Sequence, residues 1–354
     1  MHPDSAKFTC NICGSECARP PEGLEREARS CTNCGSGVRL RAVVALLSEE
    51  LFGWQMALPG FPLLKSIRAI GMTDPPELAR ALAEKFDYAN TFYHQAPRLD
   101  LTQPDERDFG RYDLILSSEV LEHVPAPVES AFCNLSRLLK PDGLLLFTTP
   151  YGLGDPTIEH FPELHEYALA TLGGRAVLVN RRRDGSIEIF EDLVFHEGDG
   201  STLEMRKFRQ GSLVEILRNA GFTSVHFATE NRPEWGVEHA QNWSLPIAAR
   251  KGSLSVSVRE VAGGYVAASR RAARAEHEFA ALKGDYERFV AYHDQREAEL
   301  MRELEKRTQW ARGEQESAAK LERELEETRS AFNRTQRSFW TRVGRKLGLL
   351  RYSR

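Results

Sequence analysis

Four cysteines in two close pairs have the spacing of a metal site. Cys10 and Cys13 form one C-x-x-C-G motif, and Cys31 and Cys34 form a second, with 17 residues between the pairs. Two thiolates at this spacing can bind one side of a metal ion, and the glycine after each pair permits a tight turn. A redox dithiol needs only one pair, so the two motifs predict a structural Zn²⁺ with four thiolate ligands.

The other two cysteines lie outside this pattern. Cys17 receives no role, and Cys133 in the apolar run AFCNLSRLL is expected to pack in a core. The first residues, MHPDSAKFTC, lack the layout of a signal peptide, and no apolar run approaches the ~20 residues that cross a bilayer. We therefore expect a cytoplasmic protein whose cysteines are reduced.

Length and composition divide the chain into parts. Its 354 residues are enough for two or three domains, and a hydrophobic content of 41% supports a buried core. The net charge of −4 counts against a nucleic-acid partner. The expected parts are a zinc ribbon (1–37), an α/β domain (38–252), a long helix (253–337) and a basic amphipathic tail (338–354).

The α/β domain is indicated by strands and helices that alternate. The strongest unit is the strand YDLILS, the helix PVESAFCNLSRLLK and the wholly apolar strand LLLFTTP, which is expected to be buried on both faces. Strand, helix and strand at this spacing make a right-handed crossover. The pattern predicts a doubly wound, mostly parallel sheet that binds ligands at the carboxyl ends of its strands.

Other segments extend the same alternation. They are the strand IRAIGMTD, the helix ELARALAEKF, the strand YANTFYH, the helix SLVEILRNAGF and the strands SVHFAT and LPIAARK. Residues 150–208 interrupt the pattern as an insertion, with a hairpin in AVLVNRRRDGSIEIFEDLVF that turns at Asp184 and Gly185. An insertion at this end of a sheet is expected to roof the substrate site.

The stretch YDLILSSEVLEHVPAPVESAFCNLSRLLKPDGLLLFTTP resembles the class I S-adenosylmethionine-dependent methyltransferases at their fourth strand, following helix and fifth strand. The resemblance covers about 64–252. It implies transfer of a methyl group from S-adenosylmethionine to an oxygen or nitrogen of a small-molecule or glycan acceptor. Chains that join a zinc knuckle to such a domain are similar to bacterial proteins associated with cell-surface glycan synthesis.

The resemblance implies roles for residues at the strand ends. Ser117, Ser118 and Glu119 occupy the positions that contact the methionine moiety and the methyl group, and Asp100 in RLDLT occupies that of the acidic residue at the adenine amine. The alternative interpretations are ordinary loop polarity for the first three and a turn aspartate for Asp100. His123 is a further catalytic candidate, placed on the first turn of a helix that faces the cleft, with a satisfied structural histidine as the alternative.

The loop after the first strand departs from the family pattern. Gly71 corresponds to the glycine-rich turn that lets the cofactor approach the backbone, but IGMTDPP lacks further glycines. Asp74 has the position of a helix N-cap, with Pro75 at the first helical position and Glu77 completing a capping box. Asp74 is therefore either a cap or a cofactor ligand.

The residue that would bind the ribose hydroxyls of the cofactor also departs from the family pattern. The second strand, YANTFYHQ, ends without an acidic residue, so His94 is the residue offered for the ribose hydroxyls. An alternative register makes IRAIGMTD the second strand and Asp74 the ribose ligand, but no first strand is then visible upstream. His160 and His165 in the insertion are the candidates for a general base that takes the acceptor's proton, with loop histidines that pack or cap as the alternative.

The C-terminal parts carry no catalytic signal. One heptad register of 253–337 places apolar residues at a and d, which indicates self-association or pairing with a partner helix: Tyr286, Val290, Leu300, Leu304, Leu321, Leu325 and Phe332. The same register also places charged residues in the seam. The tail 338–354 mixes apolar and basic residues, so peripheral membrane contact, docking to a partner and a solvated tail are all open.

Two other functions remain open from the sequence. The first is an RNA methyltransferase whose zinc knuckle grips RNA, against which the acidic balance counts. The second is a non-catalytic scaffold, which the atypical loop IGMTDPP and the long helix would suit.

Overall fold

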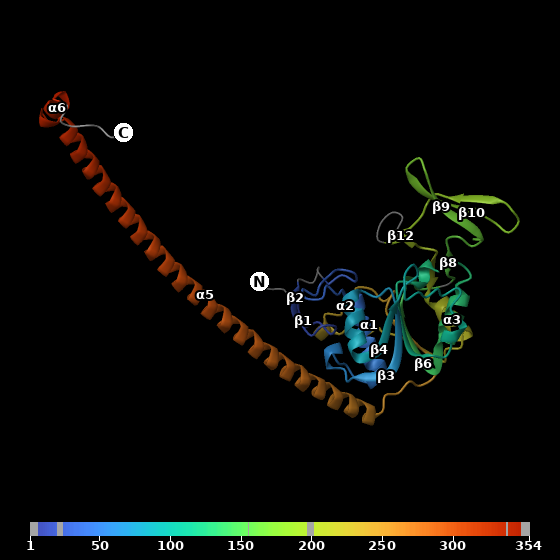
Figure 1. Cartoon of the computed structure of the whole chain (residues 1–354). Helices are drawn as coiled ribbons and strands as arrows, with labels where there is room; N and C mark the ends of the chain where they lie inside the picture. Colours follow the sequence, from blue (N-terminus) through green and yellow to red (C-terminus); the bar gives the residue numbers. More distant parts are fainter. Residues whose placement is uncertain (1–5, 20–23, 155, 197–201, 338, 348–354) are drawn as a thin grey trace. The chain divides into compact units, whose positions relative to one another are not determined.

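The computed structural model describes residues 6–19, 24–154, 156–196, 202–337 and 339–347. The chain forms two compact units, residues 1–270 and 271–354. Figure 1 shows the first unit as a ribbon of blue, green and yellow segments around one central sheet.

The first unit is built on a six-stranded sheet with the order β15-β16-β6-β5-β3-β4. The strands β3 to β6 are parallel, while β16 lies antiparallel between β6 and β15. The prediction of a doubly wound, mostly parallel sheet is confirmed. The strands are β3 (Leu64–Met72), β4 (Phe86–Thr91), β5 (Tyr112–Ser118), β6 (Leu139–Thr148), β15 (Ser224–Phe227) and β16 (Ile247–Arg250).

The position of β3 decides whether IRAIGMTD is the first or the second strand of the domain. It lies between β4 and β5 at the centre of the sheet and is parallel to both. IRAIGMTD is therefore the first strand of the domain and YANT is the second, so the alternative register is wrong.

Helices cover both faces of the sheet. They are α1 (Val38–Phe52), α2 (Pro76–Lys85), α3 (Val128–Leu138) and α4 (Gln210–Asn219). Alternate residues of each strand enter opposite cores because side chains alternate across a strand. Leu114 packs in the core with α1 and α2, whereas Ile115 packs in the core with α3 and α4 (Figure 1). Short 3₁₀ turns connect the elements: η2 (Leu58–Gly60), η3 (Glu106–Asp108), η4 (Leu121–His123) and η5 (Pro233–Trp235).

The helix α3 follows the predicted apolar periodicity, with one exception. Its buried apolar residues lie on one face: Val128, Ala131, Phe132, Leu135 and Leu138. Cys133 points to the opposite face and is exposed, so its assignment to the core is wrong. The apolar neighbours of Cys133 belong to the next helical positions, which turn toward the sheet.

The N-terminal ribbon shares the core of the α/β domain. Its strands β1 (Ala6–Thr9) and β2 (Glu16–Arg19) are antiparallel. Phe8, Cys10 and Ile12 belong to the same buried cluster as α1 and the central strands. The ribbon is thereby packed against the domain that follows it.

The insertion forms small sheets of its own. The predicted hairpin is confirmed as β10 and β11, with Gly185 at φ 88° in the turn. A further strand, β9, precedes it through Gly173 and Gly174, whose φ of 57° and 83° suit a two-residue hairpin turn. The elements are β7 (Tyr151–Gly152), β8 (Ile158–Glu159), β9 (Glu166–Leu172), β10 (Arg175–Arg181), β11 (Ile187–Phe190), β12 (Phe195–His196), β13 (Thr202–Leu203) and β14 (Arg206–Arg209).

The predicted long helix is confirmed as α5 (Val258–Arg337). Within the second unit its side chains are almost all exposed, and ion pairs such as Arg307 with Glu303, 2.7 Å apart, link successive turns. Of the predicted tail 338–354 the structure describes α6 (Phe339–Lys346) and residue 347, and the rest lies outside the described residues. No helix in the described parts of the chain is long and apolar enough to cross a membrane.

Candidate functional site

The carboxyl ends of β5 and β6 meet at one edge of the sheet. Ser118 Oγ lies 2.8 Å from Thr148 Oγ1, and the amide of Glu119 donates to the Thr148 carbonyl at 2.9 Å. Glu119 has φ 55°, a conformation that is uncommon outside glycine and is found at sites where a sharp turn is needed. Ser118 and Glu119 at the end of β5 therefore both contact Thr148 at the end of β6.

Ser117 is the most enclosed of the three. Its side chain is 1% exposed, and its hydroxyl oxygen has no hydrogen-bond partner among the described residues. Buried hydroxyl groups are normally paired, because an unpaired one loses its hydrogen bonds to water. A polar atom of a bound ligand is one group that could satisfy it.

Glu122 is a buried carboxyl group beside this edge. It lies in η4, is fully buried, and accepts a hydrogen bond from Thr149 Oγ1 at 3.0 Å. Burial, then the nearby charge of Glu119 and that of Glu204, raise its pKa to about 8. No sequence pattern assigns a role to Glu122, which lies in the segment EVLEHV.

The ring of His123 has a defined orientation. Its Nδ1 lies 2.9 Å from the carbonyl oxygen of Leu203 and must carry the proton, because a carbonyl only accepts. Its Nε2 lies 3.6 Å from Glu122 Oε1, so the imidazole and the buried carboxyl group face each other.

His160 belongs to the same polar cluster through the insertion. Its Nε2 lies 2.9 Å from Glu204 Oε1, and its amide donates to the carbonyl of Met205 at 2.9 Å. The amide of Met205 in turn donates to the Glu122 carbonyl at 2.8 Å. When the imidazole is neutral and Nε2 donates to the carboxylate, Nδ1 has the lone pair. The side chain is 30% exposed, so a substrate can reach it.

Arg206 attaches the insertion to η4. Its side chain is fully buried, with Nε 2.6 Å from Glu159 Oε1 and a terminal nitrogen 3.0 Å from the Leu121 carbonyl. A buried guanidinium needs such partners, because desolvation of a charge is costly. The insertion is thereby attached to η4, the turn that carries Glu122.

His165 does not lie with these residues. Its side chain is exposed ahead of β9, and only its backbone amide is bound, by Asn180 Oδ1 at 2.9 Å. The two predicted histidines therefore have different surroundings, although only four residues lie between them.

The loop after β3 differs from the predicted capping box. The helix α2 begins at Pro76 with Pro75 as its N-cap and without a side-chain cap, so Asp74 is not the cap. Asp74 is instead buried, and its carboxylate accepts from the hydroxyl of Tyr88. Burial raises its pKa to about 6. A Cβ at Gly71 would collide with the Tyr88 hydroxyl and the Asp74 carboxylate, so internal packing alone requires glycine there.

The other two predicted cofactor ligands lie in polar turns. Asp100 Oδ1 accepts from the amide and the hydroxyl of Thr102, at 2.9 and 2.7 Å, which is an Asx turn. The strand β4 ends at Thr91, so His94 lies three residues beyond it and is exposed. Both residues keep their cofactor roles only as predictions.

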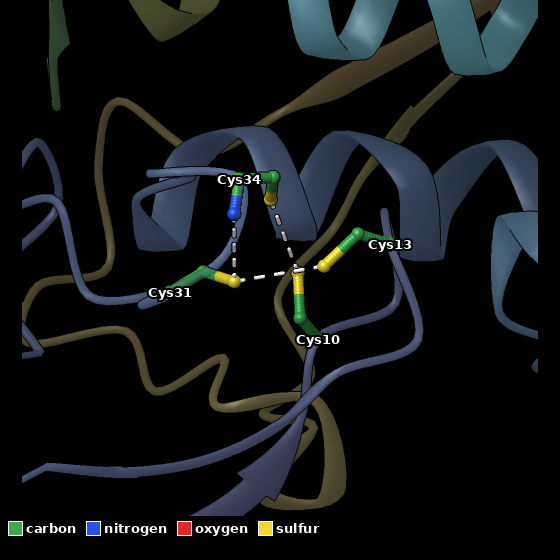
Figure 2. Close-up of side chains that lie close together, drawn as sticks. All are labelled: Cys10, Cys13, Cys31 and Cys34. Carbon is green, nitrogen blue, oxygen red and sulfur yellow. Dashed lines mark hydrogen bonds between the residues drawn. The ribbon is translucent and has the colours of Figure 1, made fainter. Parts of the chain in front are cut away.

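The four paired cysteines converge as the sequence predicted. Figure 2 shows their thiols pointing toward one another, and the four sulfur atoms lie within 4.8 Å. Cys10 Sγ is 3.7 Å from Cys34 Sγ, and Cys13 Sγ is 3.6 Å from Cys31 Sγ. Tetrahedral zinc with Zn–S bonds of ~2.3 Å separates its sulfurs by about 3.8 Å, so the cluster fits zinc.

The surroundings of the cluster shift the pKa values of its thiols in opposite directions. The glycines after each pair, Gly14 and Gly35, have φ of 79° and 69°, as the tight turns require. The thiol of Cys34 lowers the pKa of Cys10 to about 4, whereas burial raises that of Cys31 to about 11. The fully buried Arg41 supplies a nearby positive charge that favours thiolates. A fifth thiol adjoins this cluster, with Cys17 Sγ 3.7 Å from Cys31 Sγ.

Two arginines of the ribbon region reach the strand edge. Arg26 lies 2.8 Å from Glu119 Oε1, and Arg39 donates to Ser118 Oγ. Nothing in the sequence indicated these contacts, because 93 and 79 residues separate the partners. Arg39 is also paired with Glu27, at 2.8 Å.

The pKa of Glu122 predicts a pH-dependent stability. Because the pKa rises from 4.5 when unfolded to about 8 when folded, the folded chain binds the extra proton between these values. Stability is therefore lost as the pH rises through this window. Glu122→Gln should remove that loss, so it should be more stable than the wild type at about pH 8.5 but not at about pH 5.

Urea unfolding of both proteins at the two pH values measures this difference. Glu129→Gln is the matched control, because Glu129 is exposed on α3 and should leave the pH dependence unchanged. An equal pH dependence in wild type and Glu122→Gln would contradict a raised pKa.

Comparison with known proteins identifies the α/β part of the chain. Residues 66–226 match the family model described as "Methyltransferase domain". Two curated ubiquinone biosynthesis O-methyltransferases, from Acinetobacter baylyi and Actinobacillus pleuropneumoniae, are 37% and 38% identical over 75 and 78 residues. These segments are 21% and 22% of this chain and 30% and 32% of the relatives, so the chain spans about a third of their length.

A solved structure is also similar. It is 1,6-didemethyltoxoflavin-N1-methyltransferase of Burkholderia thailandensis with bound 1,6-didemethyltoxoflavin and S-adenosylhomocysteine, which is 16% identical at a TM-score of 0.30. The match covers 60% of this chain and 77% of that one. The family match confirms the prediction of a methyltransferase domain.

Proposed function

We propose that the chain is an S-adenosylmethionine-dependent methyltransferase that uses the edge formed by β5 and β6. The observation that carries the proposal is the match of residues 66–226 to a methyltransferase domain. The edge is suited to this function, because Ser117 presents an unpaired buried hydroxyl there and Glu119 adopts a strained backbone conformation.

The reaction forms a bond from the acceptor's oxygen or nitrogen to the methyl carbon and breaks the carbon–sulfur bond. The bond electrons return to sulfur, and an acceptor proton is released. S-adenosylmethionine supplies the activated methyl group, so the protein mainly positions the two reactants. His160, oriented by Glu204, receives the proton at Nδ1, and the roof held by Arg206 keeps it over the edge.

The acceptor we propose is a hydroxyl group of a small molecule or glycan. The two curated relatives support oxygen, because they are O-methyltransferases by name. The proposal that the acceptor is a glycan rests on the resemblance of the chain to zinc-knuckle methyltransferases. A hydroxyl needs a base more than an amine does, which agrees with a histidine in the roof.

The cysteine cluster completes the proposal as a structural zinc site. Cys10, Cys13, Cys31 and Cys34 would hold the ion with no open position, so it would stabilise the ribbon and take no part in catalysis.

A second candidate is a non-catalytic scaffold, which one observation favours. Gly71, the glycine of the cofactor loop, is packed against Tyr88 and Asp74. The side chains of the protein itself therefore occupy the space beside its Cα atom. In that case the domain would keep the fold without binding the cofactor.

Calorimetric titration of the full chain with S-adenosylmethionine and with S-adenosylhomocysteine separates the two candidates. We expect saturable binding of both ligands at one site per chain, because they share the nucleoside and the amino-acid portion. Absence of binding up to about 1 mM, which corresponds to roughly −4 kcal/mol, would favour the scaffold.

A further inference from the structure

We propose that the cysteine ribbon and the start of α1, which follows it, supply part of the cofactor site. In this proposal Arg39, assisted by Arg26, binds the carboxylate of the amino-acid portion of S-adenosylmethionine. The inference rests on the proposed function and adds binding residues that neither the methyltransferase match nor the sequence indicates.

The position of Arg39 is the first reason. It lies in the first turn of α1, five residues after Cys34, and its side chain is 16% exposed. Its guanidinium donates to Ser118 Oγ at the end of β5, where the methionine portion is predicted to lie. The charges of Glu27 and Glu119 keep this cation in place.

The second reason is a cavity that Arg39 lines. It has a volume of about 190 Å³ and lies between the ribbon and the first turn of α2. A cavity needs only about 15 Å³ to hold one water molecule, so this cavity has room for the amino-acid group of a ligand. Arg26 and Arg39 line one side, and Pro75 and Glu77 line the other.

The third reason is that two backbone N–H groups are missing at the start of α2. A helix N-terminus can bind a carboxylate through its free amide groups, but Pro75 and Pro76 have no N–H to donate. A carboxylate in this cavity therefore needs another donor. A guanidinium is suited to the task, because its planar fork can donate two parallel hydrogen bonds to both oxygens.

Carboxylates already occupy these arginines in the structure. Glu27 contacts the Nε of Arg39 at 2.8 and 3.0 Å, and Glu119 accepts from Arg26. The side chain of Glu27 is 56% exposed and can return to water at little cost, whereas that of Glu119 is 19% exposed. The carboxylate of Glu27 is thus the group that a ligand carboxylate replaces on Arg39.

The arrangement also connects the metal to the cofactor. Arg26 lies in the ribbon between the two cysteine pairs, and Arg39 directly follows the second pair. Folding of the ribbon around the cysteine cluster therefore places both guanidinium groups at the strand edge.

The test compares two ligands that differ only in this carboxylate, S-adenosylmethionine and decarboxylated S-adenosylmethionine. Both are titrated calorimetrically into the full-length, zinc-loaded chain. We expect the wild type to bind S-adenosylmethionine about 10- to 100-fold more tightly, the range for a charged hydrogen-bonded pair. Arg39→Met should reduce this ratio to near one while leaving the affinity for the decarboxylated ligand almost unchanged.

Control variants make the result specific. Arg80→Met removes an exposed arginine of α2 outside the cavity and should keep the wild-type ratio. Arg39→Lys keeps the charge without the fork and should give an intermediate ratio; it serves as the main variant if circular dichroism shows that Arg39→Met is unfolded. Arg26→Met should reduce the ratio less than Arg39→Met.

Three outcomes overturn the proposal in distinguishable ways. If the wild type binds S-adenosylmethionine but Arg39→Met keeps the full ratio, the carboxylate site is wrong and the proposed function stands. If Arg39→Met binds S-adenosylmethionine more tightly, the arginine obstructs the site. If the wild type binds neither ligand, the proposed function itself fails.

Discussion

Replacing Cys31 with serine is expected to reduce the zinc content of the full chain from about one ion to almost none. The four sulfur atoms already lie within 4.8 Å of one another, so loss of one leaves a site with three thiolates and an open position. Structural zinc contributes roughly 10–16 kcal/mol of apparent binding energy in small peptides, so the ribbon should unfold with the loss of metal. Elemental analysis of the purified proteins measures the zinc.

Cys133→Ser is the matched control for this experiment. Cys133 is exposed on α3 and belongs to no cluster, so this variant should keep one zinc. Cys17 lies 3.7 Å from Cys31 Sγ and could replace it as a ligand, so the double variant Cys17→Ser/Cys31→Ser is measured as well. Wild-type zinc content in the double variant would refute the four-thiolate assignment.

His160→Ala is expected to slow turnover by roughly 10²–10⁴-fold when the acceptor is a hydroxyl. The reason is that a hydroxyl with a pKa well above neutral transfers its proton during attack, and His160 is the partly exposed base of the polar cluster. Cofactor affinity should change little, because His160 is paired with Glu204 and is not one of the residues proposed to bind the cofactor. Single-turnover rates and calorimetry measure the two effects.

His165→Ala is the control, since its side chain is exposed and lies outside the cluster. It should leave both turnover and cofactor affinity unchanged. If His160→Ala turns over at the wild-type rate, the acceptor is a nitrogen that needs no base, or His123 is the base. If His160→Ala instead loses thermal stability and cofactor affinity together, its role is structural.

The polar cluster explains why neither histidine could be ranked from the sequence. His160 and His165 have the same residue type, the same loop and a separation of five residues. Their environments differ because the chain reverses between them, so that one meets Glu204 and the other meets solvent. The same applies to Glu122, whose raised pKa depends on burial under residues of the insertion.

The cofactor loop shows a local rule that the tertiary structure overrides. Asp74, Pro75 and Glu77 have the spacing of a capping box, which local propensity favours. In the folded chain Asp74 is buried against Tyr88 of the neighbouring strand, and the helix starts without a side-chain cap. A contact between parallel strands therefore decided the role of this carboxylate.

The sequence by itself determined the features that depend on short-range pattern. Apolar periodicity specified the strands and helices of the sheet, because side chains alternate along a strand and recur every three or four residues on a helix. The spacing of the cysteine pairs specified the cluster, because each pair and its glycine form a turn on their own. The hairpin at Asp184 and Gly185 was specified in the same way.

Only the tertiary structure decided which distant residues share a site. Contacts such as Arg26 with Glu119 and Arg39 with Ser118 join residues that are 93 and 79 positions apart in the chain. No periodicity or spacing records such a contact, because it arises when the ribbon packs into the same core as the central sheet. The composition of the strand edge, and the chemistry available there, follow from that packing.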